Sequence, residues 1–316
     1  MSKKMPEIDL ADGVKVQQSK ITQKKIQKLY KDVAKDLAEQ AKNLSKDGNI
    51  STKIKKNWLN RYVKNLEKEI DKLEAEIYKE VQIRMDLSAQ AIVDANIAFM
   101  GRAGLNLEGA FDKVPEKVIA NLINGKIYKG NWSFSKALWK SSKKTKKDIH
   151  NIVAKGLAEQ KSAYDIAKDL EKYVNPTAKK SWEWSKVYPG TNKKVDYNAQ
   201  RLARTLIQHS YQQSLRDTIK YNPFVDGVIW HSVFATGRTC ELCKERDGQH
   251  YAKGKEPLDH PMGLCYLEPY IPKSMEDIGK ELADWVHGKS NPAIDLYVNK
   301  AFGYEVSDRK SLEKKQ

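Results

Sequence analysis

Apolar residues recur at helical spacing through the first half of the chain. A stripe between about Ile21 and Leu44 predicts a first helix, with apolar side chains at Ile26, Tyr30, Val33, Leu37 and Leu44. Ser51 is placed to cap a second helix that continues toward Gly101. Its apolar positions step by fours and threes, the spacing of a coiled-coil seam: Leu59, Val63, Leu66, Ile70, Leu73 and Ile77. We expect the two helices to pair as a hairpin within the chain, although pairing of the seam between subunits stays open.

Shorter helices follow, each bounded by capping or breaking residues. The pattern predicts helices over Pro115–Leu122, Ala163–Val174, Tyr197–Tyr221, Met275–His287 and Pro292–Phe302. Residues 1–15 are polar and without a period, so we expect a flexible N-terminus. The irregular stretch 176–196, with its Pro189-Gly190 turn, is interpreted as a linker.

The remaining pattern is that of short strands. Val228–Phe234 predicts a strand, Tyr266–Ile271 predicts an extended segment, and Asp247-Gly248 between them favours a type I′ hairpin turn. The fold class is therefore α+β and mainly α. We expect a helical, basic domain over 16–175, a small α+β domain over 197–272, and C-terminal helices with a charged tail over 273–316.

All three cysteines lie in this small domain. Cys240 and Cys243 have the C-x2-C spacing of a metal knuckle, and His260 and Cys265 offer two further ligands. A Cys3His set suits a structural Zn²⁺ with a closed coordination shell, and a domain this small could draw much of its folding free energy from the metal.

Other interpretations of the same residues stay open. The cysteines could be a reduced thiol pair, and His231 or His250 could replace His260 as the fourth ligand. A thioredoxin-like redox pair is disfavoured, because no strand-to-helix pattern surrounds the cysteines.

The order of residues around the cysteines resembles the signature of the Mu F-like minor head protein family of tailed bacteriophages. The preceding helix also resembles that of the family, at Arg204 and Thr205. The matching positions in the signature are Arg238, Thr239, Cys240, Cys243, Asp247, Gly248, His260, Pro261, Cys265 and Pro269. The spacing from His260 to Cys265 departs from the ending that is usual in that family.

The resemblance implies a minor head (capsid) protein that acts in head morphogenesis. Such a protein would contact the phage portal protein and other capsid proteins. It would lie inside the capsid beside packaged double-stranded DNA, after a stage in the host cytoplasm during virion assembly. Copy number and oligomeric state are not implied.

Charge adds a candidate nucleic-acid interface. The formal net charge is +16, and the helical half carries most of it, whereas residues 201–316 are nearly neutral. Lysines and aromatic residues such as Trp139 alternate between Lys126 and Lys147, so we expect sequence-independent, salt-sensitive DNA binding there. The candidate residues are Lys136, Lys140, Lys143, Lys144, Lys146 and Lys147. The alternative is a solvated basic face with Phe134, Leu138 and Trp139 in the core.

Two other classes of function compete with the capsid interpretation. One is a cytoplasmic DNA-binding protein without sequence specificity. The other is a metal-dependent nuclease or toxin built on Asp247, Asp259 and His260, which is disfavoured because three thiolates make a poor magnesium site. We assign no catalytic residue and expect no enzyme.

We also expect no membrane association, because the sequence contains neither an apolar run of spanning length nor a signal-peptide pattern.

Overall fold

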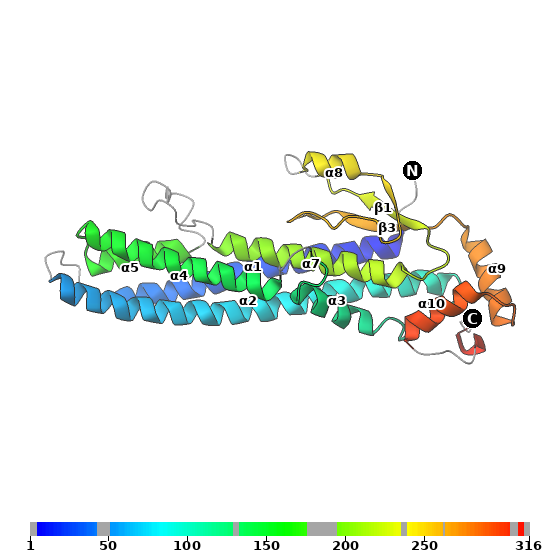
Figure 1. Cartoon of the computed structure of the whole chain (residues 1–316), viewed down its shortest axis with the longest axis horizontal. Coiled ribbons are helices and arrows are strands. Elements are labelled where there is room, and N and C mark those ends of the chain that lie inside the picture. Colours follow the sequence, from blue (N-terminus) through cyan, green and yellow to red (C-terminus); the bar gives the residue numbers. More distant parts are fainter. Residues whose placement is uncertain are drawn as a thin grey trace. The chain divides into compact units, whose positions relative to one another are not determined.

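The computed structural model describes residues 5–42, 51–128, 133–175, 195–234, 239–261, 263–303 and 309–312. Most of the expected linker lies outside these ranges, as do Leu44 and Arg238. The chain is mainly helical with one small antiparallel sheet, which confirms the predicted fold class (Figure 1). None of the helices in the described ranges has a stretch both long and apolar enough to span a membrane.

The helices follow the predicted pattern closely where capping residues are present. Ser162 and Asn291 cap α5 and α10 through their side-chain oxygens, and those helices have the expected bounds. The α-helices are α1 Pro6–Ala41, α2 Thr52–Arg102, α3 Lys113–Ile123, α4 Phe134–Ala158, α5 Ala163–Val174, α7 Val195–Ile219, α8 Glu241–Arg246, α9 Met275–Val286 and α10 Pro292–Phe302, and a short 3-10 turn covers Arg309–Leu312.

The sheet has the strand order β2-β1-β3 and is antiparallel throughout. Its strands are β1 Gly227–His231, β2 His250–Ala252 and β3 Tyr266–Tyr270. Asp247-Gly248 does not form the expected type I′ hairpin turn. It follows helix α8, Asp247 has φ −60° and ψ 127°, Gly248 has φ 74°, and Gln249 N donates to Arg246 O. These are the features of a type II turn, in which glycine supplies the positive φ.

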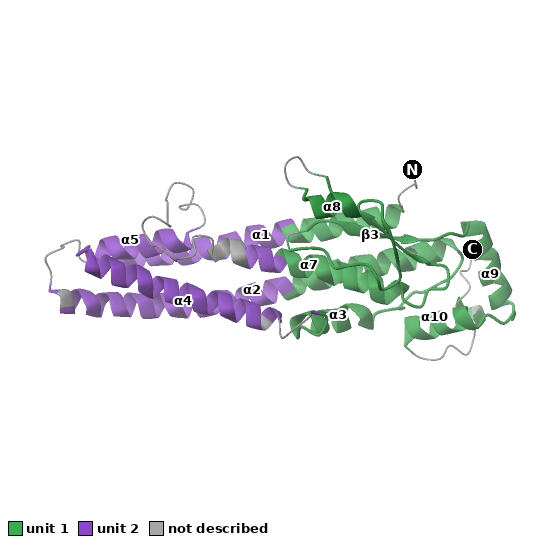
Figure 2. Ribbon diagram, turned by 45° about the horizontal axis from the view of Figure 1, so that its top comes forward, with its two compact units in different colours: residues 1–19, 82–127, 204–316 green, residues 20–81, 128–203 purple. Residues whose placement is uncertain are grey.

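The chain divides into two compact units, each assembled from separate segments (Figure 2). Unit 1 comprises residues 1–19, 82–127 and 204–316, and unit 2 comprises residues 20–81 and 128–203. This division differs from the consecutive domains that the sequence pattern favoured. The boundaries at 19/20, 81/82 and 203/204 fall within helices α1, α2 and α7, and the boundary at 127/128 falls in the connection between α3 and α4.

Unit 2 is built on the predicted seam. The six seam residues of α2 are buried, and the apolar stripe of α1 is buried from Ile26 to Leu37. Lys25 pairs with Glu80 at 2.9 Å, and the Tyr62 hydroxyl donates to Leu37 O at 3.1 Å, so the two helices run antiparallel. The seam is therefore buried within this chain, as the hairpin interpretation predicted.

Unit 1 contains the sheet and has two hydrophobic clusters. One lies among α2, α9 and α10 around Phe99, Trp285 and Tyr297. The other joins Ile8 of α1, Tyr211 of α7 and Trp230 of β1 to the cysteines Cys243 and Cys265.

The expected flexible N-terminus is wrong for residues 6–15, which form the start of α1. Ile8 and Ala11 are buried in the second cluster of unit 1. Met5 N donates to the buried carboxylate of Glu268 at 3.1 Å, which anchors the start of the helix to β3. Long-range packing within unit 1 overrides the lack of a local apolar period.

Candidate metal centre

The four predicted ligands come from two loops and one short helix of unit 1. Cys240 precedes α8 and Cys243 lies in its first turn, so the C-x2-C spacing directs both thiols to one side of the helix start. His260 and Cys265 flank the loop that leads into β3. Cys243 and Cys265 are buried, Cys240 is exposed, and no disulfide joins them.

The ligand atoms of these residues lie close together. His260 Nε2 is 3.0 Å from Cys243 Sγ and 3.4 Å from Cys240 Sγ, and Cys243 Sγ is 3.5 Å from Cys265 Sγ. Cys240, Cys243 and His260 form one group that could hold a metal ion, and Cys243 belongs to a second group with Asp259 and Cys265. Thiolates bound to one tetrahedral ion at about 2.3 Å would lie roughly 3.8 Å apart, so these spacings are compatible with a shared metal.

The histidine is held in the tautomer that metal binding needs. Its Nδ1 lies 3.0 Å from the carbonyl oxygen of Pro261, which can only accept a hydrogen bond, so Nδ1 carries the proton. In the neutral imidazole Nε2 is then the unprotonated nitrogen, and it is the atom that faces the sulfurs. Orientation of a ligating imidazole through its other nitrogen is usual in metal sites.

Asp259 organises the loop between the two late ligands. This buried carboxylate accepts His260 N–H at 2.8 Å on Oδ1 and Cys265 N–H at 3.2 Å on Oδ2. Burial raises the pKa of Asp259, and nearby positive charge and these hydrogen bonds oppose the shift. A Cβ atom at Gly263 would overlap the same carboxylate, so any other residue there would force the loop or the carboxylate to move.

Helix α7 contacts this loop with polar side chains. The buried residues Gln208 and His209 donate to the carbonyl oxygens of Cys265 and Asp259, the second over 2.9 Å, and Asp259 N donates to Gln212 Oε1 at 2.9 Å. These contacts pack α7 on the cysteine loop, and His209 is buried between them. Burial lowers the pKa of His209, which keeps the imidazole neutral.

Lys15, which is distant in the sequence, also supports the loop that carries Cys265. Its fully buried ammonium donates to Leu264 O at 3.2 Å and Cys265 O at 3.1 Å, and it pairs with Asp12 at 2.6 Å. Sequence reasoning missed Lys15, because a lysine in a polar N-terminal stretch carries no sign of burial.

Ser232 and Asp247 hold the first cysteine pair. The Ser232 hydroxyl donates to Cys243 O at 2.6 Å, and Ser232 N donates to Asp247 Oδ1 at 2.8 Å. Asp247 therefore serves the backbone of the knuckle.

The surroundings of Cys240 and Cys243 shift the pKa values of the two thiols in opposite directions. A hydrogen bond from the backbone of Cys243 lowers the pKa of Cys240, whereas burial raises the pKa of Cys243. A cation would favour the thiolate form of both, which is the form that binds metal. The donor set therefore fits a metal ion, and the soft sulfur ligands exclude a site built for magnesium.

The alternative fourth ligands are engaged elsewhere. His231 lies 2.7 Å from Glu268 and stacks on Tyr266, and the ring of His250 contacts that of Tyr270. Neither belongs to the metal-capable groups found in the described part of the chain. His260 is therefore the histidine that accompanies the cysteines.

The candidate DNA-binding lysines separate into two sets on α4. Lys144 pairs with Asp148 at 3.5 Å and Lys146 with Asp71 at 2.6 Å. The other four, spaced by four, three and four residues, form one exposed stripe: Lys136, Lys140, Lys143 and Lys147. Within the described residues, Lys140, Lys143 and Lys147 form no ion pair.

The aromatic residues of this segment also separate. Phe134 and Leu138 are buried, as the core interpretation predicted, but Trp139 is 58% exposed. Lys143 Nζ lies 5.0 Å from the centre of the Trp139 ring. An exposed tryptophan beside a lysine stripe is a surface on which a nucleic-acid base or sugar could pack.

Comparisons with known proteins do not extend this picture. No protein-family profile, curated protein or solved structure matches the chain.

Proposed function

We propose that this chain is a minor head protein of a tailed phage, with a structural zinc ion in its C-terminal region. The observation that supports the proposal is the grouping of Cys240, Cys243, His260 and Cys265 in space. The resemblance selects these four residues by their order alone. Their proximity makes chance agreement of the motif a weaker explanation.

Zinc is the metal that the donor chemistry favours. Three thiolates and one imidazole match the ligand set of structural zinc sites, and four protein ligands leave no position for substrate. When bound, the ion would crosslink α8 to the loop before β3. Asp259, His209, Gln212 and Lys15 would hold that loop in the same geometry.

In this role, unit 1 would be the docking module toward the portal and other capsid proteins. Unit 2 would contact packaged DNA without sequence specificity, through the lysine stripe and Trp139. The capsid interior and, during assembly, the host cytoplasm are the corresponding locations.

A second candidate is a DNA-binding protein that acts outside any capsid. Unit 2 has 33 lysine and arginine residues against 17 aspartate and glutamate residues, whereas unit 1 has 24 of each. The whole excess of +16 thus belongs to the helical unit. Such a surface favours polyanion binding whatever the role of unit 1.

We propose no enzymatic activity. Asp247 and Asp259 both accept backbone hydrogen bonds that shape the cysteine loops. A nuclease would need these carboxylates to bind a hard cation or a water molecule.

The deciding experiment is co-expression with the portal and major capsid proteins of the tailed phage that the proposal implies, followed by purification of DNA-free procapsids. Under the minor-head proposal, the chain remains with the procapsid at a few copies per particle after a high-salt wash. The Cys265→Ser variant should be lost from the particle, and Ser311→Ala, an exposed substitution in the same unit, should be retained. Failure to co-purify while DNA binding persists would favour the second candidate.

A further inference from the structure

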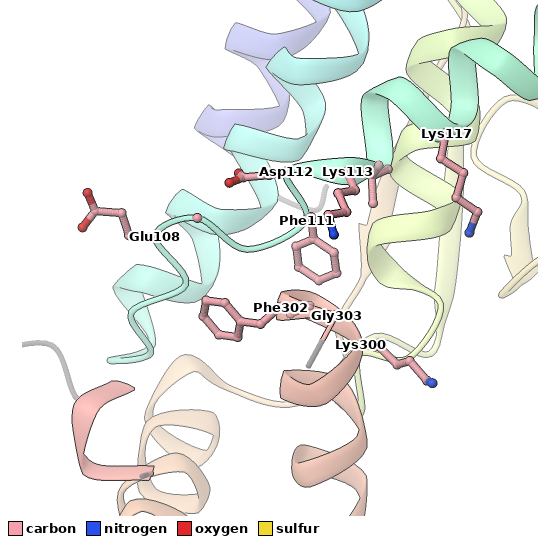
Figure 3. Close-up of a pocket in the computed structure, with 11 residues that line it drawn as sticks. Glu108, Phe111, Asp112, Lys113, Lys117, Lys300, Phe302 and Gly303 are labelled. Carbon is pink, nitrogen blue, oxygen red and sulfur yellow. The ribbon is translucent and has the colours of Figure 1, made fainter. Parts of the chain in front are cut away.

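A groove in unit 1, apart from the metal centre, runs between the loop before α3 and the end of α10 (Figure 3). Its main chamber has a volume of about 540 Å³, within the usual range for ligand pockets. The phenyl rings of Phe111 and Phe302 face the space between these elements. A neighbouring chamber of about 300 Å³ is lined by residues at the end of α7, and Phe111, Val114, Lys117 and Lys300 line both chambers.

Lysines surround the groove. Lys113, Lys117 and Lys300 line the main chamber, and Lys220 lines the neighbouring one. Lys220 and Lys300 both approach the ring of Tyr221, at 5.0 and 5.9 Å from its centre. Two ammonium groups therefore converge on one aromatic side chain.

Three carboxylates, those of Glu108, Asp112 and Asp217, line the chambers together with the four lysines. Asp217 lies 3.7 Å from Lys117, while Lys113, Lys220 and Lys300 form no ion pair within the described residues. Figure 3 shows the carboxylates of Glu108 and Asp112 pointing away from the lysine ammonium groups. The lining lysines thus outnumber the lining carboxylates by one, and most of these lysines have no carboxylate partner among the described residues.

The apolar wall is held in place at a conformational cost. Phe111 has φ 63°, a left-handed conformation that is unusual for a bulky residue. Its N–H donates to Ala301 O at 2.6 Å, which ties the loop to α10. This hydrogen bond holds one aromatic wall of the groove beside the end of α10 against the strain of the positive φ.

We propose that this groove binds an acidic segment of a partner protein, with an apolar side chain between Phe111 and Phe302 and carboxylates at the lysines. A peptide suits both features, because its apolar side chain enters the chamber while its carboxylates reach the rim. A nucleic-acid backbone presents phosphates but has no comparable apolar group to fill a chamber of this size. The proposal is independent of the metal and of the phage assignment.

The test uses the full-length protein and two fluorescein-labelled peptides of about ten residues, one alternating glutamate with phenylalanine and one with glutamine in place of glutamate. Binding is followed by fluorescence anisotropy at several salt concentrations. Two double variants remove the same charge, Lys113→Gln/Lys300→Gln in the groove and Lys140→Gln/Lys147→Gln on α4. Phe302→Ala removes part of the apolar wall.

We expect the glutamate peptide to bind and the glutamine peptide to bind at least about tenfold more weakly. The groove double variant and Phe302→Ala should each weaken binding by about tenfold, and the α4 double variant should leave it within about twofold. Equal weakening by both double variants would show non-specific charge attraction and overturn the proposal. Displacement of the peptide by an unlabelled oligonucleotide from the wild type, but not from the α4 variant, would also overturn it.

Discussion

The two units obtain their stability and their charge in different ways. Unit 2 buries a long apolar seam between helices, carries the excess of lysines, and exposes most of the lysines that the structure describes. Unit 1 has balanced charge and buries polar side chains, among them Lys15, Gln208, His209 and Asp259, around the cysteine loops. The stability that an apolar seam contributes depends mainly on the apolar area that it buries. A buried polar group is tolerated only when it has a hydrogen-bond or ion-pair partner.

The two units should therefore be sensitive to different kinds of substitution. A single altered partner should damage unit 1, because an unsatisfied buried polar group or ligand costs much more than it contributes when paired. Unit 2 should tolerate changes on its surface and lose polyanion binding instead of stability.

The largest effect should follow removal of a buried metal ligand. Cys265→Ser should abolish binding of about one zinc ion per chain and unfold the cysteine region, a loss of more than about 4 kcal/mol. Hydrogen exchange resolved by mass spectrometry should show lost protection in unit 1 and unchanged protection in α2 residues 59–77. Addition of a chelator to the wild type should give the same pattern. Retained zinc, or simultaneous unfolding of both units, would contradict the comparison.

A smaller effect should come from Gly263→Ala. The new Cβ meets the Asp259 carboxylate, so either the loop or that side chain must move, at a cost of about 2 kcal/mol. Gly279→Ala in α9 is the matched control, because its Cβ would meet Ala103 O at an ordinary 3.6 Å. For both variants, competition with a chelator measures the zinc affinity and urea unfolding measures the free energy of unfolding. An unchanged zinc affinity in Gly263→Ala would mean that Asp259 does not position the ligands.

On unit 2, the expected change is in binding. Lys140→Gln/Lys143→Gln/Lys147→Gln should weaken duplex DNA binding by about tenfold. It should also reduce the slope of log K against log salt by about 0.9 for each phosphate that the variant no longer neutralises. Lys72→Gln/Lys144→Gln/Lys146→Gln removes the same charge from lysines that already have carboxylate partners, and it should change the slope less. Fluorescence anisotropy against salt measures both, and equal slopes would refute the stripe as the surface that binds DNA.

The smallest effect should be a pH dependence carried by His209. Its pKa is lowered by burial, so on acidification the unfolded chain takes up a proton first. The stability contribution of neutral His209 is present above about pH 6.5 and is lost as pH falls toward the folded pKa, by at most about 1.4 kcal/mol per pH unit.

Urea unfolding of the zinc-loaded protein at about pH 7.5 and about pH 5.5 checks this. His209→Gln keeps a donor for the Asp259 carbonyl and should show a smaller loss of stability at the lower pH than the wild type. His287→Gln, at an exposed position, should behave as the wild type does. An equal loss in all three proteins would assign the pH dependence to other groups.

Much of the fold was predictable because its signals are local. Local signals include the apolar seam of α2, the capping serine Ser162 and the helix-starting Pro292. Each acts within a few residues, so the helices that they define lie where the pattern predicts. The cysteine spacing likewise identified a cluster that does form. The turn type at Asp247-Gly248 was mispredicted, because a helix and not a strand precedes it.

The sequence by itself determined the helical periods, the net charge and the order of the candidate ligands, since each is written in residue type and spacing. The tertiary structure alone decided that Lys15 supports Cys265 and that His260 joins the cysteines while His231 and His250 do not. It also decided that all of the excess charge belongs to one unit. These outcomes depend on contacts between residues up to 250 positions apart, for which no local pattern exists.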